Sequence, residues 1–353
     1  MLSPAARHLS APDCPGKVIR VLDRGKPGAG RQDRRARWKE HGARLVASYD
    51  ELLTHDHGEL VDGVLICAGK NGDDRPIVRD VVQRLSAAWK EGQTPRFILH
   101  LSTVSARFAQ AAAEFAAARG VLYANYPLTG GPAGADAATM LILACGDPGL
   151  YERVRPVLEF LGKPRFFGEF PTAGAETKLI GHYLVFHGLL GICSGAVLQH
   201  AAQPEAASVE FFDFLNQGAG HTRQWELALR RGLADGNWDT GFYCRHGAVD
   251  ALYAIQLGLD NGLMMTSLLP MFEIALLFAL AVQSSVGQQA EFATQAIYQH
   301  LMGAHGQTAN QLLADLVDLR NPRKSLENVL SVLPPPIRQT VALEIEGPAY
   351  FEG

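Results

Sequence analysis

The order of apolar and polar residues divides the chain into two parts with different periodicities. In the first part, short apolar runs typical of buried strands alternate with amphipathic stretches of helical length. The predicted strands are 17–23, 44–47, 63–68, 97–101, 121–125 and 140–145, and the predicted helices are 31–41, 75–90 and 106–119. Strands that alternate with helices are typical of a mostly parallel sheet, so we expect an α/β domain here.

Strand-like runs disappear after about Gly168, and long helical segments follow. The predicted helices of this part are 174–202, 205–217, 222–231, 246–282 and 286–302. We therefore expect an α/β domain over 1–168 and an all-α domain over 169–320. Residues 321–353, with three prolines at 334–336, are predicted to form a C-terminal extension.

Two helical segments carry almost no charge. Residues 179–204 contain no Asp, Glu, Lys or Arg, and 261–290 contain only Glu273. Both are long enough to cross a bilayer. Histidines interrupt the first, Pro270 and Glu273 interrupt the second, and neither has the Lys/Arg asymmetry at its flanks that sets membrane topology. We favour the buried centre of an all-α domain over a membrane span.

Composition narrows the class of protein further. The 353 residues include 36 acidic and 32 basic ones, 47% are apolar and 19% are charged, which is typical of a folded chain with a large core. Segment 17–44 holds ten Lys or Arg against three acids. A nucleic-acid patch is one interpretation, but no aromatic series accompanies it, and a solvated helix face is favoured. Five scattered cysteines and no secretory signal predict a cytoplasmic protein.

A doubly wound sheet that binds a dinucleotide usually opens with a strand and the pattern GxGxxG. The one candidate, Gly28 to Asp33, matches poorly, because four residues separate it from the preceding strand and Asp33 replaces the third glycine. A negative charge at that position would lie beside the phosphates. We favour a surface loop that binds no ligand over a phosphate loop.

Three motifs in order carry a family resemblance. They are HLST at 100–103, NYPLTGGPAGA at 125–135 and GAETKLIGH at 174–182. In order and spacing they resemble the D-x-S-T, D-A-P-V-S-G-G-x-x-G-A and G-x-x-x-K-x-x-N-N segments of the β-hydroxyacid dehydrogenases. This group includes the 3-hydroxyisobutyrate and tartronate semialdehyde reductases and shares its fold with 6-phosphogluconate dehydrogenase. The resemblance implies a Rossmann-like N-terminal domain followed by an all-α C-terminal domain.

The resemblance also sets a register for the N-terminus. MLSPAARHL fits the segment that follows the first two glycines of the family's phosphate loop, which makes KVIRVLDR the second strand of the fold. In that register the first strand and its glycine pair lie before Met1, and Leu2 takes the place of the third glycine. We therefore expect a Rossmann-like domain without its first strand and glycine loop.

By resemblance, Lys178 is the catalytic acid/base of a hydride transfer. Burial suits this role because desolvation lowers the pKa of a lysine toward neutrality. The alternative is a lysine that begins a helix and extends to solvent. The family's two asparagines are Gly181 and His182 here. His182 shares a helix face with Lys178, and either it donates a hydrogen bond to substrate or it is a core histidine bonded to a backbone carbonyl.

Further substrate contacts follow from the same comparison. Thr129, Gly130 and Gly131 replace the family's S-G-G, where a hydroxyl and two unhindered N–H groups form a carboxylate cradle; a simple turn is the alternative. Phe242 and Asp250 match the family's F…K-D segment, in which Val249 replaces the lysine. No residue is predicted to bind a metal.

The cofactor expected from the resemblance is NAD or NADP. Asp23 ends the second strand, where an acid hydrogen-bonds the ribose hydroxyls and favours NAD, whereas Arg24 at the next position would hold the 2′-phosphate of NADP. Ala68 and Gly69 fall in the cofactor loop after the fourth strand of the family. Ser102 and Thr103 match the pair that lies along the nicotinamide ribose.

These expectations combine into one leading hypothesis. The chain is predicted to be an NAD(P)-dependent oxidoreductase of a small β-hydroxy acid or its semialdehyde. The resemblance implies a homodimer built around the helix that carries Lys178, with a small carboxylate as substrate and neither nucleic acid nor membrane as partner. The alternatives are an imine or ketone reductase on the same fold, and a non-catalytic dimeric scaffold or sensor whose cofactor site has decayed.

Overall fold

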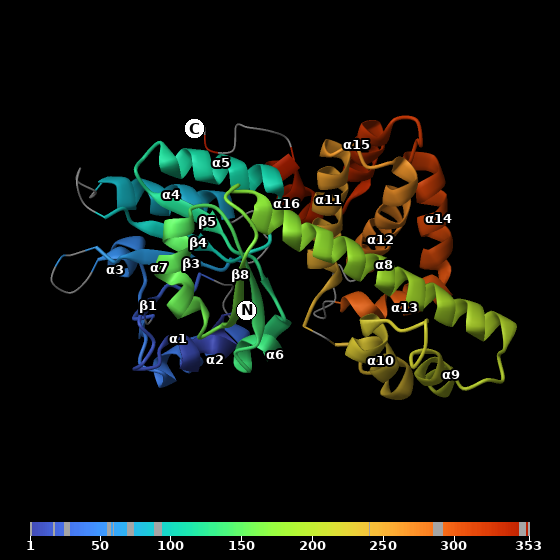
Figure 1. Cartoon of the computed structure of the whole chain (residues 1–353). Helices are drawn as coiled ribbons and strands as arrows, with labels where there is room; N and C mark the ends of the chain where they lie inside the picture. Colours follow the sequence, from blue (N-terminus) through green and yellow to red (C-terminus); the bar gives the residue numbers. More distant parts are fainter. Residues whose placement is uncertain are drawn as a thin grey trace. The chain divides into compact units, whose positions relative to one another are not determined.

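The computed structural model describes residues 2–16, 18–24, 29–54, 58, 60–68, 74–87, 94–239, 241–284, 292–345 and 351 (Figure 1). The chain forms two compact units. The first contains Met1–Lys178 and Glu346–Gly353, and the second contains Leu179–Ile345.

The first unit is built on parallel strands. Strands β1 (Arg20–Val21) and β2 (Arg44–Leu45) pair in parallel. Strands β3 (Gly63–Ile66), β4 (Phe97–His100) and β5 (Leu122–Asn125) form a second parallel sheet in the order β3-β4-β5. A third sheet pairs β6 (Leu128–Thr129) antiparallel with β7 (Met140–Ala144), and β7 parallel with β8 (Gly162–Phe166).

Helices cover both faces of the β3-β4-β5 sheet because neighbouring residues of each strand are apolar. On β4, Ile98 packs in one core with helices α4 (Asp74–Ala87) and α5 (Ala106–Ala117). Leu99 points to the other core, which contains residues of α1 (Ala6–Leu9), α2 (Ala29–Glu40) and α7 (Pro148–Leu158). Two short helices, α3 (Tyr49–Leu53) and α6 (Gly131–Asp136), complete the unit. Two buried faces explain the continuous apolar runs, and the predicted α/β class is confirmed.

The second unit is helical. Helix α8 (Ala173–Ala202) begins in the first unit and continues into the second. The further helices are α9 (Ser208–Leu215), α10 (Arg230–Asp235), α11 (Cys244–Asp260), α12 (Met265–Ser284), α13 (Ile297–Met302), α14 (Ala304–Leu316), α15 (Pro322–Val332) and α16 (Pro335–Ile345). A π-helical turn, Trp225–Leu229, precedes α10. The predicted all-α second domain is confirmed.

Several predicted boundaries differ from the structure. The single helix predicted over 246–282 is two helices, because the chain turns at Asn261–Gly262, where Gly262 has a φ of +72°. The predicted extension 321–353 forms α15 and α16 up to Ile345, and Val329 and Ile337 are fully buried in the helical core. The boundary between the two units therefore follows Lys178 rather than residue 168. Residues 321–345 belong to the second unit and do not form a separate extension.

The predicted surface loop Gly28–Asp33 is also corrected. Ala29 begins α2, so residues 29–33 are helical, and Gly28 lies outside the described residues. Strand 17–23 shortens to Arg20–Val21, and Lys17 is likewise outside. Ahead of β1 the described chain forms a 3-10 turn at Ser3–Ala5 and then α1.

Helices α8 and α12 are long and apolar enough to cross a membrane by length and composition. Their burial differs: in the most apolar window 61% of α12 is buried, which fits a core helix, but only 28% of α8 is buried. The exposed residues of α8 form one helical stripe, since Ile180, Leu184, Gly191 and Leu198 recur at helical spacing. This set is called the α8 stripe below.

The last described residue belongs to the first unit. The ring of Phe351 stacks on Phe115 of α5, with centroids 4.7 Å apart and planes at 21°, and lies 5.7 Å from Phe108. The guanidinium of Arg119 lies 3.8 Å from the Phe115 ring centroid. The chain thus leaves the first unit at Lys178 and returns to it at Phe351.

Candidate active site

The carboxyl ends of β3 and β4 are joined by Ser102. Its Oγ accepts a hydrogen bond from the N–H of Ala68 at 3.0 Å and donates to the carbonyl of the same residue at 3.3 Å. Ser102 is buried, whereas Thr103 and Ala68 are half-buried. Three of the predicted cofactor residues therefore meet at one edge of the sheet, the edge where ligands bind in open α/β folds. Gly69 lies outside the described residues.

A buried asparagine braces the same edge from β5. The Asn125 Nδ2 donates to the carbonyls of His100, at 2.8 Å, and Ser102, at 3.0 Å. Two bonds to alternate carbonyls fix the path of the chain where it leaves β4. Asn125 lies at the first position of the motif NYPLTGGPAGA, so its place in that motif was the signal available from sequence.

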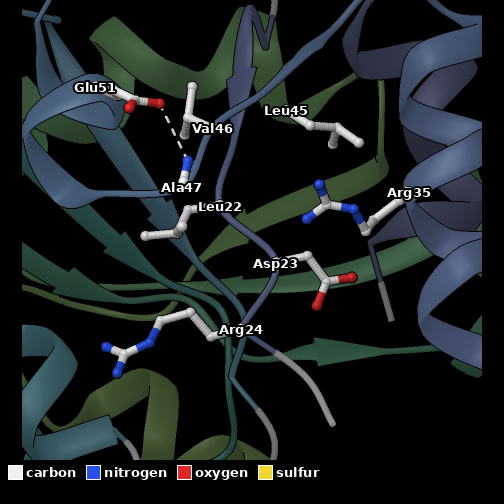
Figure 2. A pocket seen from close by; sticks show the side chains of 8 residues that line it. All are labelled: Leu22, Asp23, Arg24, Arg35, Leu45, Val46, Ala47 and Glu51. Atoms are coloured by element: carbon white, nitrogen blue, oxygen red, sulfur yellow. Dashed lines mark hydrogen bonds between the residues drawn. The ribbon is translucent and has the colours of Figure 1, made fainter. Parts of the chain in front are cut away.

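A pocket of about 410 Å³ opens at the ends of β1 and β2. Asp23, Arg24 and Arg35 of α2 line it, together with apolar side chains (Figure 2). The Asp23 carboxylate accepts two bonds from Arg34, at 3.1 and 3.4 Å. Glu51, the other acid of the pocket, accepts from the N–H of Ala47.

The arginines of this pocket differ in their partners. Arg24 donates to the Tyr49 hydroxyl at 2.8 Å. Within the described part of the chain, no acid pairs with Arg35. Figure 2 shows the Arg35 side chain reaching from α2 toward the segment that carries Asp23, while Arg24 points away from both. Both acids of the pocket are engaged by protein donors, and within the described residues neither Arg24 nor Arg35 pairs with an acid. Sequence reasoning missed Arg35.

The segment Thr129–Gly131 forms a tight turn into α6. Gly130 and Gly131 have φ values of +127° and +65°, which L side chains rarely adopt. A Cβ at Gly130 would lie 3.2 Å from the Met140 Sδ, whereas nothing lies within 4 Å of one at Gly131. Thr129 is half-buried at the end of β6. The turn leaves open space at Gly131, in agreement with either the predicted cradle or a plain turn.

Lys178 lies in the second turn of α8 and is 8% exposed. Burial lowers the pKa of its ammonium to about 8, because desolvation disfavours the charged form. Among the residues that the structure describes, none forms an ion pair or a hydrogen bond with Nζ. A buried lysine without a counter-charge is costly, and such lysines are typical of sites that exchange protons near neutral pH.

His182, one turn after Lys178, pairs with Asp250 of α11. His182 Nδ1 lies 3.0 Å from Asp250 Oδ2, and the two residues are 9% and 1% exposed. The imidazole lies between aromatic neighbours, with its centroid 5.4 Å from Phe186 and 5.8 Å from Phe242. The structure therefore brings together three predicted substrate residues of the second unit. Val249 is fully buried in the helical core, which explains an apolar residue at that position.

Comparisons with known proteins bear on this geometry. Residues 29–174 match the sequence model described as the NAD binding domain of 6-phosphogluconate dehydrogenase. The matched region contains every strand-end residue described above except Asp23 and Arg24. The predicted resemblance to the family that includes 6-phosphogluconate dehydrogenase is confirmed. A nicotinamide cofactor is confirmed for the matched domain.

Similar proteins extend the comparison beyond the NAD-binding domain. The L-threonate dehydrogenase of Escherichia coli is 29% identical over 56% of this chain and 64% of its own length. The 2-(hydroxymethyl)glutarate dehydrogenase of Eubacterium barkeri is 24% identical over 41% and 48%. The chain thus spans about half to two thirds of the length of these curated relatives.

One solved structure shows that the fold of both units recurs. The 3-hydroxyisobutyrate dehydrogenase of Mycobacterium tuberculosis, described with L-serine, matches 85% of this chain and 95% of its own with a TM-score of 0.63 and 20% identity. At that identity the likeness shows the fold. A Rossmann-like domain followed by a helical domain is therefore confirmed.

Proposed function

We propose that the protein is an NAD(P)-dependent oxidoreductase that interconverts a small hydroxy acid and its carbonyl form. The observation that carries the proposal is Lys178, a buried lysine with no counter-charge among the described residues, whose pKa is lowered to about 8. It follows directly on the NAD-binding domain, which ends at residue 174. A proton-exchanging group next to a hydride-transfer domain is what alcohol oxidation requires.

The chemistry divides between cofactor and protein. A bound nicotinamide would accept the hydride from the carbinol carbon. The neutral Nζ of Lys178 would accept the hydroxyl proton as the C=O bond forms, and in the reverse direction the ammonium would return it. Asp250 would hold the imidazole of His182 in one orientation so that its other nitrogen is directed to substrate.

A carboxylate is the proposed anchor of the substrate. The relatives named above act on threonate and 2-(hydroxymethyl)glutarate, and the solved structure is described with L-serine. Each of these molecules carries a hydroxyl and a carboxylate. The open, positive-φ turn at Gly131 and the hydroxyl of Thr129 are proposed to bind that carboxylate.

The pocket at β1 and β2 supports NADP over NAD. In NAD-specific sites an acid at this position hydrogen-bonds both ribose hydroxyls. Here Arg34 engages both oxygens of that acid, Asp23, and Arg35 has no acid partner among the described residues. A 2′-phosphate would supply the missing negative charge. We therefore propose that Arg35 is the main contact of this phosphate and that Arg24 borders it.

A homodimer is the proposed assembly. The α8 stripe exposes the apolar side chains of Ile180, Leu184 and Leu198 along one face of the helix, and each is more than half accessible. A second copy of the same stripe would cover it, and the small residues between would permit close approach of the two helices. The protein is proposed to act in the cytoplasm, without a membrane or nucleic acid as partner, in keeping with its five free cysteines.

The imine or ketone reductase alternative rests on one observation. His182, which pairs with Asp250, stands at a position where the resembled family has asparagine, so a titratable group replaces a neutral amide. Such a pair would protonate a nitrogen as readily as it would orient a hydroxyl.

The test is a cofactor titration followed by a substrate panel. NADPH and NADH fluorescence titrations with purified protein should show tighter binding of NADPH. Threonate, serine, 3-hydroxyisobutyrate and cyclic imines should then be assayed, and a hydroxy acid should turn over at a rate that rises through about pH 8 in the oxidation direction. Turnover of imines alone would favour the alternative. If neither cofactor binds, the proposal is wrong, and the hypothesis of a non-catalytic scaffold or sensor is favoured.

A further inference from the structure

A second histidine–aspartate pair lies in the first unit, in the core beneath the cofactor edge. His100 Nε2, at the end of β4, lies 2.7 Å from Oδ1 of Asp74, the first residue of α4. His100 Nδ1 lies 2.8 Å from the Tyr123 hydroxyl on β5. His100 is fully buried and Asp74 is 2% exposed. No solvent or substrate reaches these atoms, so the pair is not itself a catalytic site.

The protons of this network follow from the chemistry of its members. A carboxylate only accepts, so Nε2 donates to Asp74; in the neutral imidazole, Nδ1 then accepts from the Tyr123 hydroxyl. Each ring nitrogen therefore has one partner. The Asp74 charge also lies in the first turn of a 14-residue helix, where the helix dipole stabilises it.

The position of the pair gives it a consequence for the cofactor edge. Beyond the end of β3, Ser102 holds Ala68 by two hydrogen bonds, and at the start of α4 His100 holds Asp74. His100 ends β4 and Ser102 lies two residues beyond it, and the same Asn125 amide binds the carbonyls of both. His100 and Ser102 thus hold the chain at Asp74 and at Ala68.

We propose that Asp74 and His100 are positioning residues for the nicotinamide cofactor. The inference rests on the proposed function, in which a nicotinamide cofactor binds, and on the expectation that Ala68 contacts it. The bond to Asp74 fixes the imidazole of His100 at the end of β4, and two residues later Ser102 holds the backbone of Ala68 at the strand ends. Loss of the His100–Asp74 bond would weaken cofactor binding by about ten-fold, because misplaced binding groups lose contacts without being removed.

The two nitrogens of His100 allow a matched pair of substitutions. In His100→Gln the side-chain amide occupies the position of Nε2 and retains the bond to Asp74. In His100→Asn it occupies the position of Nδ1, retains the contact with Tyr123 and loses Asp74. Tyr123→Phe removes only the hydroxyl. A network that merely stabilises the core would respond to all three changes by loss of stability alone.

The experiment measures the dissociation constants of NADPH and NADH by fluorescence titration, together with the thermal midpoint of each variant. His100→Asn and Asp74→Ala should raise both constants about ten-fold. His100→Gln and Tyr123→Phe should stay within about two-fold of wild type even where the midpoint falls. Amide hydrogen exchange should also be measured without cofactor. The exchange rate at Ala68 and in the first turn of α4 should rise in His100→Asn but not in His100→Gln.

The outcomes separate the inference from the proposed function. If the wild type binds neither cofactor, the proposed function fails, and the exchange measurement still tests the positioning role. If the wild type binds and His100→Asn binds equally well, the positioning role is wrong. Equal weakening in His100→Asn, His100→Gln and Tyr123→Phe would also overturn it, because a general loss of core packing would then explain the effect.

Discussion

The imidazole Nδ1 of His182 lies 3.0 Å from the carboxylate oxygen Oδ2 of Asp250, and both side chains are buried in the helical unit. When one member of a buried polar pair is removed, the other keeps its desolvation cost without its partner. Asp250→Ala should therefore lower the free energy of unfolding by about 1–3 kcal/mol. Asp250→Asn keeps an oxygen at the same position and should cost less. Urea denaturation at pH 7 measures both, and equal losses would contradict the role of the oxygen.

Lys178 predicts an unusual dependence of stability on pH. Its folded pKa of about 8 is below the usual value of about 10.4. At pH 7 the lysine is protonated in both states, and the folded state carries the cost of a buried charge. Between about pH 8 and 10.4 the folded state releases the proton while the unfolded state keeps it, so stability rises with pH across this window.

Lys178→Met removes that cost. The variant should be more stable than wild type at pH 7 by about 3 kcal/mol, and the difference should vanish above about pH 10.4. It should have no detectable turnover in either direction. Lys163→Met, an exposed position on β8, is the control and should change stability by less than about 0.5 kcal/mol at any pH. A Lys178→Met variant less stable than wild type at pH 7 would refute the argument.

Arg35 predicts cofactor selectivity. Removal of its guanidinium in Arg35→Ala should raise the dissociation constant of NADPH about ten-fold and leave that of NADH nearly unchanged, because only NADPH carries the 2′-phosphate. Arg37→Ala, an exposed position on the same helix, is the matched control. The NADPH effect should also shrink at high salt. If Arg35→Ala weakened the binding of NADPH and NADH equally, Arg35 would not contact the 2′-phosphate.

Two glycines of α8 should respond in opposite directions to alanine. A Cβ at Gly174 would lie 2.5 Å from the Asn125 carbonyl and 2.7 Å from the Leu143 carbonyl, both backbone atoms, so Gly174→Ala should cost at least about 1–3 kcal/mol. A Cβ at Gly181 meets nothing within 4 Å, and Gly181→Ala should gain up to about 1 kcal/mol from helix propensity. Thermal unfolding of the two variants checks the contrast.

The α8 stripe predicts a dimer that charge disrupts. Leu184→Glu and Leu198→Glu should each convert the wild-type dimer to a monomer in light scattering coupled to size-exclusion chromatography, since a buried unpaired carboxylate at an interface is costly. Leu227→Glu, at a position 45% exposed but off the stripe, should leave the dimer intact. A monomeric wild type that sediments with liposomes would favour the membrane interpretation instead.

Sequence reasoning succeeded where local patterns decide structure. Strands β3, β4 and β5 have apolar side chains toward both covered faces, so their runs are recognisable without tertiary information. Strand β8 was missed because its sequence, Gly162–Phe166, contains a lysine, a proline and an arginine, and within the described residues it pairs with β7 alone, at the edge of its sheet. The break between α11 and α12 depends on one glycine within a long apolar segment.

The candidate site divides in the same way. The motifs indicated Lys178, Ser102 and Asp250, and the burial of Lys178 agrees with the reasoning from desolvation. The contacts that side chains of the site make with distant parts of the chain could not be predicted from the sequence. Asp74 and His100 are separated by 26 residues, and only the fold brings them together, just as the ion pair of Asp23 with Arg34 depends on how α2 packs. Roles assigned by motif are thus modified by contacts that no motif encodes.

The stacking of Phe351 on Phe115 has a consequence for biosynthesis. A ribosome completes α5 before it begins the helical unit, and it adds Phe351 after that unit. The N-terminal unit is therefore synthesised first but gains this aromatic contact only after the helical unit has been made. During translation the surface of Phe115 and Phe108 stays uncovered, which makes it a place where a nascent-chain chaperone would bind.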